Sequence, residues 1–177
     1  VGSYLGNPLH PMAKLSEQLV VEYLNRKGYF CIHGLRQGVN DSDILAIGKK
    51  NGSIEALHVE VQTSFRPQAH LSNKSAKRRS DAEVTSDMAA WLNKKFLSAK
   101  IQRIRKQLWP DTTWKFVFVH ARLADERELK FLGKKGIELI GFREVLQGIS
   151  VPAGKDGYTC APGGDISEIL RYCGETD

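Results

Sequence analysis

Two β-compatible runs, 42–48 and 54–62, flank a short polar turn, and this pattern predicts a β-hairpin. The turn between the runs contains Asn51-Gly52, a pair that supplies the positive φ angles of tight hairpin turns. Antiparallel pairing across this turn returns the end of the second run, with Glu60 and Gln62, to the level of Ser42 and Asp43. We therefore expect two carboxylates to meet at one end of the hairpin.

The two faces of the second run differ in character, because successive strand residues point to opposite sides. One face is apolar and the other is polar: Leu57, Val59 and Val61 against His58, Glu60 and Gln62. A carboxylate set among apolar residues beside a second carboxylate is costly unless a cation neutralises the pair. Hard divalent ions prefer carboxylate oxygens, so we expect Asp43 and Glu60 to hold Mg²⁺ or Mn²⁺. Asp41, on the same face as Asp43, is the alternative ligand.

The remaining periodicities predict helices and strands around this hairpin. We expect a first helix over 12–27, a strand over 29–33, a loop over 34–40, a helix over 81–108, a strand over 114–120, a helix over 123–135, a strand over 137–141 and a helical turn over 142–147. The long helix carries two apolar stripes on different faces, which a bend near Asn93-Lys94 would reconcile. The order of strand, helix and strand over 114–141 predicts a parallel crossover. The fold class expected is α/β, with an αβββαβ core and a central mixed sheet flanked by helices.

The length of 177 residues fits one domain. We expect the core domain to be 12–148, residues 1–11 to be a cloning remnant or a disordered N-terminus, and 149–177 to be an irregular extension with a short helix. The three cysteines show no C-x-x-C spacing, which argues against a disulfide framework or a zinc site and favours a cytoplasmic location. No apolar run approaches the length of a membrane span.

The net charge of +6 favours an anionic partner such as nucleic acid. Two basic stretches follow the hairpin, and each is either a phosphate-binding surface or a solvated one. The loop over 63–80 has no acid and would contact phosphates through Arg66, Lys74, Lys77, Arg78 and Arg79. On the long helix, Lys95, Arg103 and Lys106 lie opposite the second apolar stripe and would face the DNA backbone. Arg36, in the loop before the hairpin, would lie at the rim of the carboxylate site.

The sequence of Asp43 followed by Glu60-Val61-Gln62 resembles the PD-(D/E)xK nuclease superfamily, which has the restriction endonuclease-like fold, in a Glu-x-Gln variant of its motif. The resemblance covers roughly residues 12–140. It implies a metal-dependent endonuclease that hydrolyses DNA phosphodiester bonds, of the restriction, repair or Holliday-junction-resolving type. It also implies that the Val61 carbonyl is a further metal ligand and that Gln62 hydrogen-bonds the attacking water, where most members have Lys.

Several alternatives stay open at the level of sequence. Glu17 lies at the edge of the apolar stripe of the first helix, where it either leans toward the carboxylates to bind a second metal or its water, or is solvated. His58 and His120 are interpreted as packed strand histidines, with proton transfer as the alternative. Because Gln62 carries no cation, a catalytically lapsed nucleic-acid-binding module is the second functional hypothesis, and a domain with two chance acids is the third. RNA as the partner and a homodimer are also open.

Overall fold

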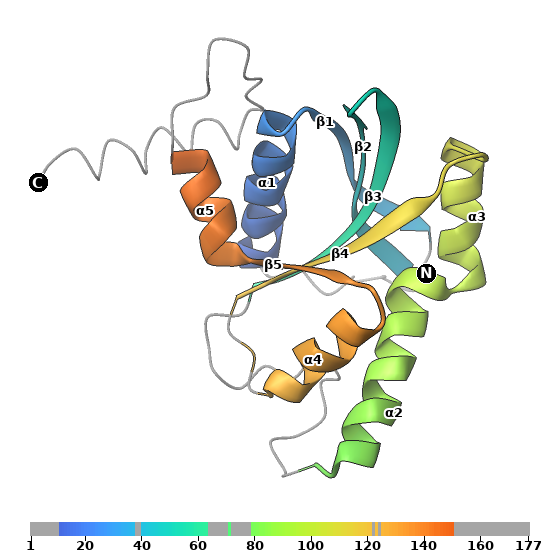
Figure 1. Cartoon of the computed structure of the whole chain (residues 1–177), viewed down its shortest axis with the longest axis vertical. Coiled ribbons are helices and arrows are strands. Elements are labelled where there is room, and N and C mark those ends of the chain that lie inside the picture. Colours follow the sequence, from blue (N-terminus) through green and yellow to red (C-terminus); the bar gives the residue numbers. More distant parts are fainter. Residues whose placement is uncertain are drawn as a thin grey trace, which may run out of the picture.

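The centre of the molecule is a five-stranded mixed sheet with strand order β1-β2-β3-β4-β5 (Figure 1). The computed structural model describes residues 11–37, 40–63, 71, 79–121, 123 and 125–150. The strands are β1 (Tyr29–Gln37), β2 (Asn40–Lys50), β3 (Ser53–Gln62), β4 (Trp114–His120) and β5 (Glu138–Gly141). Strands β1, β2 and β3 pair antiparallel, whereas β3, β4 and β5 pair parallel. The predicted α/β class with a mixed sheet is confirmed.

Helices cover both faces of this sheet (Figure 1). They are α1 (Pro11–Arg26), α2 (Asp81–Leu92), α3 (Ala99–Leu108), α4 (Glu126–Lys134) and α5 (Phe142–Ser150), with a π-helical segment η1 (Asn93–Leu97) between α2 and α3. Helices α1 and α5 pack on the face that carries Leu57 and Val59. Helix α2, η1 and α4 pack on the other face, around Phe96 and Phe118, both fully buried. The polar side chains of β3, His58 and Glu60, therefore lie beneath α2, η1 and α3.

The predicted hairpin forms at the predicted turn. Asn51 and Gly52 have φ values of 52° and 83°, the left-handed conformation that a tight two-residue turn requires. Pairing runs from Lys50 opposite Ser53 to Ile44 opposite Val59. In this register the next residues, Asp43 and Glu60, come level with each other.

The loop predicted over 34–40 is largely strand. Strand β1 continues to Gln37, β2 begins at Asn40, and Arg36 pairs with Asp41 across the ladder. Main-chain hydrogen bonds between strands do not depend on apolar side chains, so a polar, glycine-containing segment can still extend a ladder begun by its neighbours. The backbone of Arg36 thus belongs to a strand, whereas its side chain lies outside the described residues.

The bend predicted near Asn93-Lys94 is confirmed. The α-helix ends at Leu92, η1 follows as a π-helix, and Ser98 has extended backbone angles (φ −60°, ψ 143°) before α3 begins. A π-turn holds more residues than an α-turn and therefore rotates the face that the following residues present. Met88, Phe96 and Ile101 are all buried, although the three would not share one face of a straight helix.

Arg79 has a different role from the phosphate contact that its sequence neighbourhood predicts. Its side chain is buried, and its guanidinium lies 2.6 Å from Glu128 Oε1, 3.3 Å from Asp125 Oδ2 and 3.4 Å from Asp87 Oδ2. Glu128 is itself fully buried and also accepts a hydrogen bond from the Leu71 amide. Arg79 therefore joins α2 to α4. The other predicted phosphate contacts of this loop, Arg66, Lys74, Lys77 and Arg78, lie outside the described residues.

Replacing Arg79 with methionine should lower the free energy of unfolding by about 3 kcal/mol, because the change leaves buried carboxylates without their cation. Urea denaturation measures this value. Lys134→Ala, at an exposed position of α4, is the control and should change stability by less than about 0.5 kcal/mol. Equal stability of the Arg79 variant and the wild type would contradict a structural role.

The predicted C-terminal extension over 149–177 falls largely beyond residue 150, where the described residues end, as does its predicted short helix. The predicted N-terminal segment 1–11 lies outside them as well, except for Pro11 at the start of α1. Among the helices of the described part of the chain, none combines the length and apolar character needed to cross a membrane.

Candidate functional site

Two carboxylates meet where β2 and β3 stop pairing. The last paired residues are Ile44 and Val59, and the register places Asp43 opposite Glu60 on the same face of the sheet. Glu60 is 1% exposed and Asp43 is half-buried. Beyond the ladder, the Val61 amide donates a 2.8 Å hydrogen bond to Asp43 Oδ2. The Asp43 carboxylate thus replaces the backbone acceptor that β2 no longer supplies.

The surroundings of this pair disfavour two negative charges. Burial raises the pKa of Asp43 to about 7, and the neighbouring Glu60 charge acts in the same direction, against smaller opposing effects of Lys95 and the Val61 amide. Burial also raises the pKa of Glu60, although the Lys95 ammonium acts in the opposite direction. Near neutral pH the pair therefore requires a proton or a cation.

Lys95 brings a cation to these carboxylates. Its Nζ lies 2.5 Å from Glu60 Oε2, and its side chain is 28% exposed. The lysine comes from η1, and the next residue, Phe96, is fully buried against the Phe116 ring, 5.1 Å between centroids. The sequence pattern places Lys95 among the residues that face the DNA backbone, whereas the structure shows its ammonium at Glu60.

The second oxygen of Glu60 is held by a buried chain of hydrogen bonds. Arg105 Nη1 lies 3.3 Å from His58 Nδ1, and His58 Nε2 lies 3.1 Å from Glu60 Oε1. Burial, followed by the Arg105 charge, lowers the pKa of His58 to about 3, so the imidazole is neutral. A guanidinium only donates, so we assign the ring proton to Nε2, which donates to Glu60. His58 is buried as expected, and its two nitrogens position Glu60.

Arg105 is fixed in turn by its own surroundings. Its Nη2 donates a 2.8 Å hydrogen bond to the Phe96 carbonyl, and its guanidinium carbon lies 4.7 Å from the centroid of the Phe116 ring. The contact with Phe96 ties α3 to the π-turn that carries Lys95. Arg105 therefore fixes the position of His58, which contacts Glu60, and of η1, which carries Lys95.

The other predicted site residues occupy the same end of the sheet or lie on the opposite face. Gln62 is half-buried at the end of β3, and its carbonyl accepts a 3.3 Å hydrogen bond from the Ala121 amide. His120 stacks on Phe118 at the same end, with 5.9 Å between ring centroids. Glu17 is half-buried on α1, which covers the opposite face of the sheet, so its role as a ligand of a second metal stays a prediction. The side chain of Asp41 lies outside the described residues.

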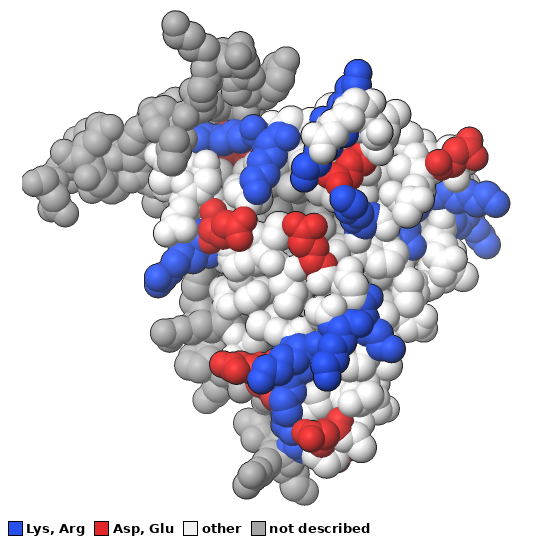
Figure 2. Space-filling model, viewed as in Figure 1, with Lys and Arg blue, Asp and Glu red and all other residues white. Residues whose placement is uncertain are grey.

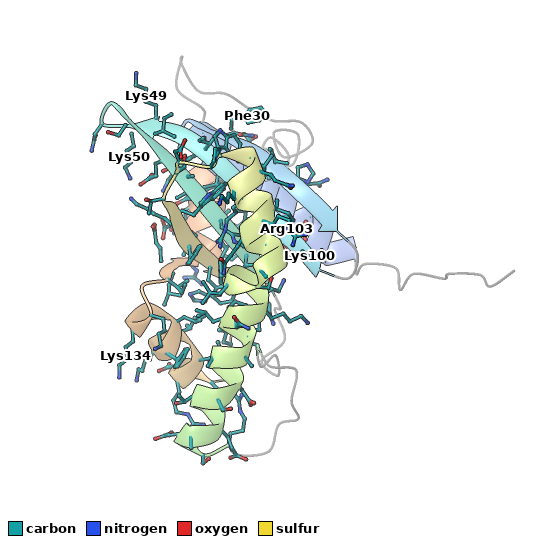
Figure 3. The ribbon with its side chains drawn as sticks, turned by 90° about the vertical axis from the view of Figure 1, so that its right-hand side faces the viewer. Phe30, Lys49, Lys50, Lys100, Arg103 and Lys134 are labelled. Atoms are coloured by element: carbon teal, nitrogen blue, oxygen red, sulfur yellow. The ribbon has the colours of Figure 1, made fainter. Side chains whose placement is uncertain are left out.

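Two of the predicted nucleic-acid contacts lie on the surface of α3. Arg103 and Lys106 are both exposed, and Figure 3 shows Arg103 and its neighbour Lys100 on the outer side of this helix. On the face shown in Figure 2, other basic side chains gather over α4 and near the tip of the β2–β3 hairpin, interleaved with acidic ones. Helix α3 itself contains no acidic residue.

Sequence reasoning missed the roles of Lys95 and Arg105. The helical pattern of 94–106 is consistent with a solvent-facing basic helix, but the break at Ser98 separates Lys95 from the second apolar stripe. Two signals were present in the sequence. Lys95 follows Trp91 by four residues and Met88 by seven, on the apolar side of the first half of the helix. Arg105 follows Ile101 by four residues on the second apolar stripe, where a solvated arginine is not expected.

The donor set suits a hard divalent cation. Asp43 and Glu60 offer carboxylate oxygens, which Mg²⁺ and Mn²⁺ prefer. In the described part of the chain, no three His, Cys, Asp or Glu side chains come together as a metal-binding group. A Mg²⁺ ion does not need such a cage, since it commonly binds through one or two carboxylates and keeps waters or substrate phosphates for its other positions.

Comparison with known proteins adds little to this geometry. Neither a family model nor a curated protein matches the sequence. Among solved structures, the chain is similar to the crystal structure of a protein of unknown function, AF1548, with 15% sequence identity and a TM-score of 0.46. The match covers 76% of this chain and 65% of that one, so the chain spans less than two thirds of the length of that protein. Any assignment of function therefore rests on the site itself.

Proposed function

We propose that this protein is a metal-dependent endonuclease that hydrolyses phosphodiester bonds of DNA, with its active site at Asp43, Glu60 and Lys95. The observation that carries the proposal is the Lys95 ammonium 2.5 Å from a buried Glu60 that stands opposite Asp43. Burial raises the pKa of both carboxyl groups, so keeping the two at one point costs stability. Groups of this kind are typical of catalytic sites.

Each side chain has a role in this reaction. Asp43 and Glu60 would hold the metal, and the Val61 carbonyl is a further candidate because the N–H and C=O of one strand residue point to the same side. When bound, Mg²⁺ or Mn²⁺ would lower the pKa of a coordinated water and offset charge on the phosphate. Lys95 supplies the cation that Gln62 lacks, and its flexible stem allows its ammonium to reach the attacking water or the phosphate.

The proposal takes up the expected resemblance to the PD-(D/E)xK nucleases and changes one part of it. In that motif the lysine follows the glutamate on the same strand, and here the strand carries Gln62. Lys95 reaches the same glutamate from η1 instead. This contact favours an active enzyme over the lapsed binding module.

The proposal is tested by incubating supercoiled, linear, branched and single-stranded DNA with the protein in Mg²⁺, in Mn²⁺ and in EDTA. We expect cleavage of at least one of these substrates that requires the metal. Salt-sensitive DNA binding without any cleavage would overturn the proposal in favour of the binding module. If the protein neither binds nor cuts any of these DNAs, the proposal is wrong and only the fold is established.

The raised pKa of Asp43 leads to a prediction about stability and pH. Asp43 binds its proton more tightly in the folded chain, with a pKa of about 7, than in the unfolded chain, near 3.8. The protonated Asp43 therefore contributes its full stabilisation at pH values below its pKa in the unfolded chain. This stabilisation is lost as the pH rises through about 7. Without divalent metal, Asp43→Asn should be more stable than the wild type at about pH 8 by about 1 kcal/mol or more, and this advantage should shrink toward about pH 5.

Urea denaturation of both proteins in EDTA measures this difference. The groups that face Asp43 titrate in both proteins, and among them His58, with its lowered pKa, reduces stability as the pH falls below its ordinary value. The difference between the two proteins reports the ionisation of Asp43 together with its interaction with Glu60. Adding Mn²⁺ at about pH 8 should stabilise the wild type and not Asp43→Asn. A wild type that is the more stable of the two in EDTA at high pH would contradict the prediction.

A further inference from the structure

An open cleft lies between α3 and the beginning of β4, away from the carboxylates. Its volume is about 540 Å³, and two tryptophans, Trp109 and Trp114, form part of its wall with Phe116. The two indole rings lie 5.9 Å apart between centroids and are tilted by 58°. Both tryptophans are only half-buried. Aromatic faces of this size that remain open to solvent are suited to stacking against a planar ligand.

The cleft is also basic. Arg103, Arg105 and Lys106 are among its lining residues, and none of the described residues that line it is acidic. Arg103 and Lys106 are exposed, whereas Arg105 is buried with its guanidinium over the Phe116 ring. The ligand that fits such a wall combines a planar ring with negative charge, as a nucleotide does.

The position of the cleft relates it to the candidate active site. In the parallel β3–β4 ladder, Trp114 pairs with Ala56 and Phe118 pairs with Glu60. The four residue-to-residue steps from Trp114 to Phe118 span about 13 Å of strand, which equals about four nucleotide steps of a DNA strand at about 3.4 Å each. One DNA strand can therefore reach from the cleft to the Asp43–Glu60 pair. Arg105 links the two directly, because it lines the cleft and donates to His58 behind Glu60.

We propose that this cleft binds an unpaired nucleotide of the DNA substrate, with the base against Trp109 and Trp114 and the adjoining phosphates at Arg103 and Lys106. A base inside a duplex is covered on both faces by its neighbours, so only an unpaired base can stack on a protein ring. The inference rests on the proposed function and refines it. The substrate class becomes DNA with a single-stranded part next to the cleaved bond, such as a flap, a fork or a branch.

Binding is tested in EDTA, so that no strand is cut, by fluorescence anisotropy of labelled single-stranded DNA and of a labelled blunt duplex. The variants are Trp109→Ala and Arg103→Glu. The matched control is Lys134→Glu on α4, an exposed lysine far from α3 in Figure 3. Thermal unfolding shows that each variant is folded. Arg103→Glu changes an exposed side chain, so it still tests the cleft if Trp109→Ala does not fold.

We expect Trp109→Ala to weaken binding of the single strand about tenfold or more, and binding of the duplex less than about threefold. Arg103→Glu should weaken single-strand binding as well and reduce its salt dependence, since one phosphate contact is lost. Lys134→Glu should change single-strand binding less than about threefold. Folded cleft variants that bind the single strand like the wild type would overturn the inference, as would equal losses for single strand and duplex.

The two proposals fail in different ways. If the cleft variants lose single-strand binding and no substrate is cut in Mg²⁺ or Mn²⁺, the cleft is a nucleotide site on a protein that is not a nuclease. If metal-dependent cleavage occurs and the cleft variants cut flapped and blunt DNA in the same ratio as the wild type, the nuclease stands and the cleft inference is wrong.

Discussion

Glu60→Gln should reduce metal-dependent cleavage by about 10³-fold or more. Glutamine keeps the size of the side chain but removes the charge that a divalent ion requires, and the carboxylate that Lys95 contacts disappears with it. Rates of single-turnover cleavage in Mn²⁺, measured with the best substrate of the panel, give the effect. Calorimetric titration with Mn²⁺ should show that metal binding is lost in parallel.

The fold should survive this change, because the amide oxygen of the introduced glutamine can still accept the hydrogen bond from His58 Nε2 that the structure shows for Glu60. DNA binding in EDTA should remain within about threefold of the wild type. Asp43→Asn should give a comparable loss, and the double variant should lose little more than either single variant, since both residues act on one metal. A Glu60→Gln protein that cuts at the wild-type rate would rule out this carboxylate pair as the active site.

Lys95→Met should lower the cleavage rate by about 10²- to 10³-fold, as expected when a cation that stabilises transition-state charge is removed. Methionine preserves the apolar stem of lysine but carries no charge. The DNA affinity in EDTA should change little, which separates this role from the phosphate contact that the sequence suggested.

Lys94→Met is the matched control, because Lys94 is the preceding residue of η1 and is exposed. It should leave the cleavage rate within about threefold. A rescue variant makes the test sharper: adding Gln62→Lys to Lys95→Met returns an ammonium to the strand and should recover part of the lost rate. A Lys95→Met rate within about threefold of the wild type would show that this lysine only neutralises Glu60 in the absence of metal.

The part of the site built by the hairpin could be predicted from sequence because its determinants are local. Asn51-Gly52 fixes the turn, the turn fixes the register, and the register sets Asp43 opposite Glu60. Because alternate residues of a strand share one face, His58 lies on the same face of the sheet as Glu60. The mixed sheet follows from the same local signals, since the hairpin sets β2 and β3 antiparallel and two crossovers set β3, β4 and β5 parallel.

The contacts of Lys95 and Arg79 could not be predicted, because they depend on tertiary packing. The pattern of 94–106 predicts a solvent-facing Lys95, whereas the folded chain brings its ammonium to Glu60 and packs Phe96 against Phe116. Arg79 stands in a basic loop and becomes structural only because α4 brings Asp125 and Glu128 to it. Charge patterns along the chain identify cations but not their partners.

The origin of the candidate catalytic lysine has a consequence for recognising relatives of this chain. A pattern search for a glutamate and a lysine two positions apart on one strand would miss any protein that supplies its lysine as this one does. If Lys95 supplies the catalytic cation, lysine is not required at the strand position held by Gln62. The number of residues from the start of α2 to Lys95 is constrained instead, since one insertion or deletion there would turn Lys95 away from Glu60. Relatives should therefore be sought by the constant length of that helical segment rather than by a motif within the strand.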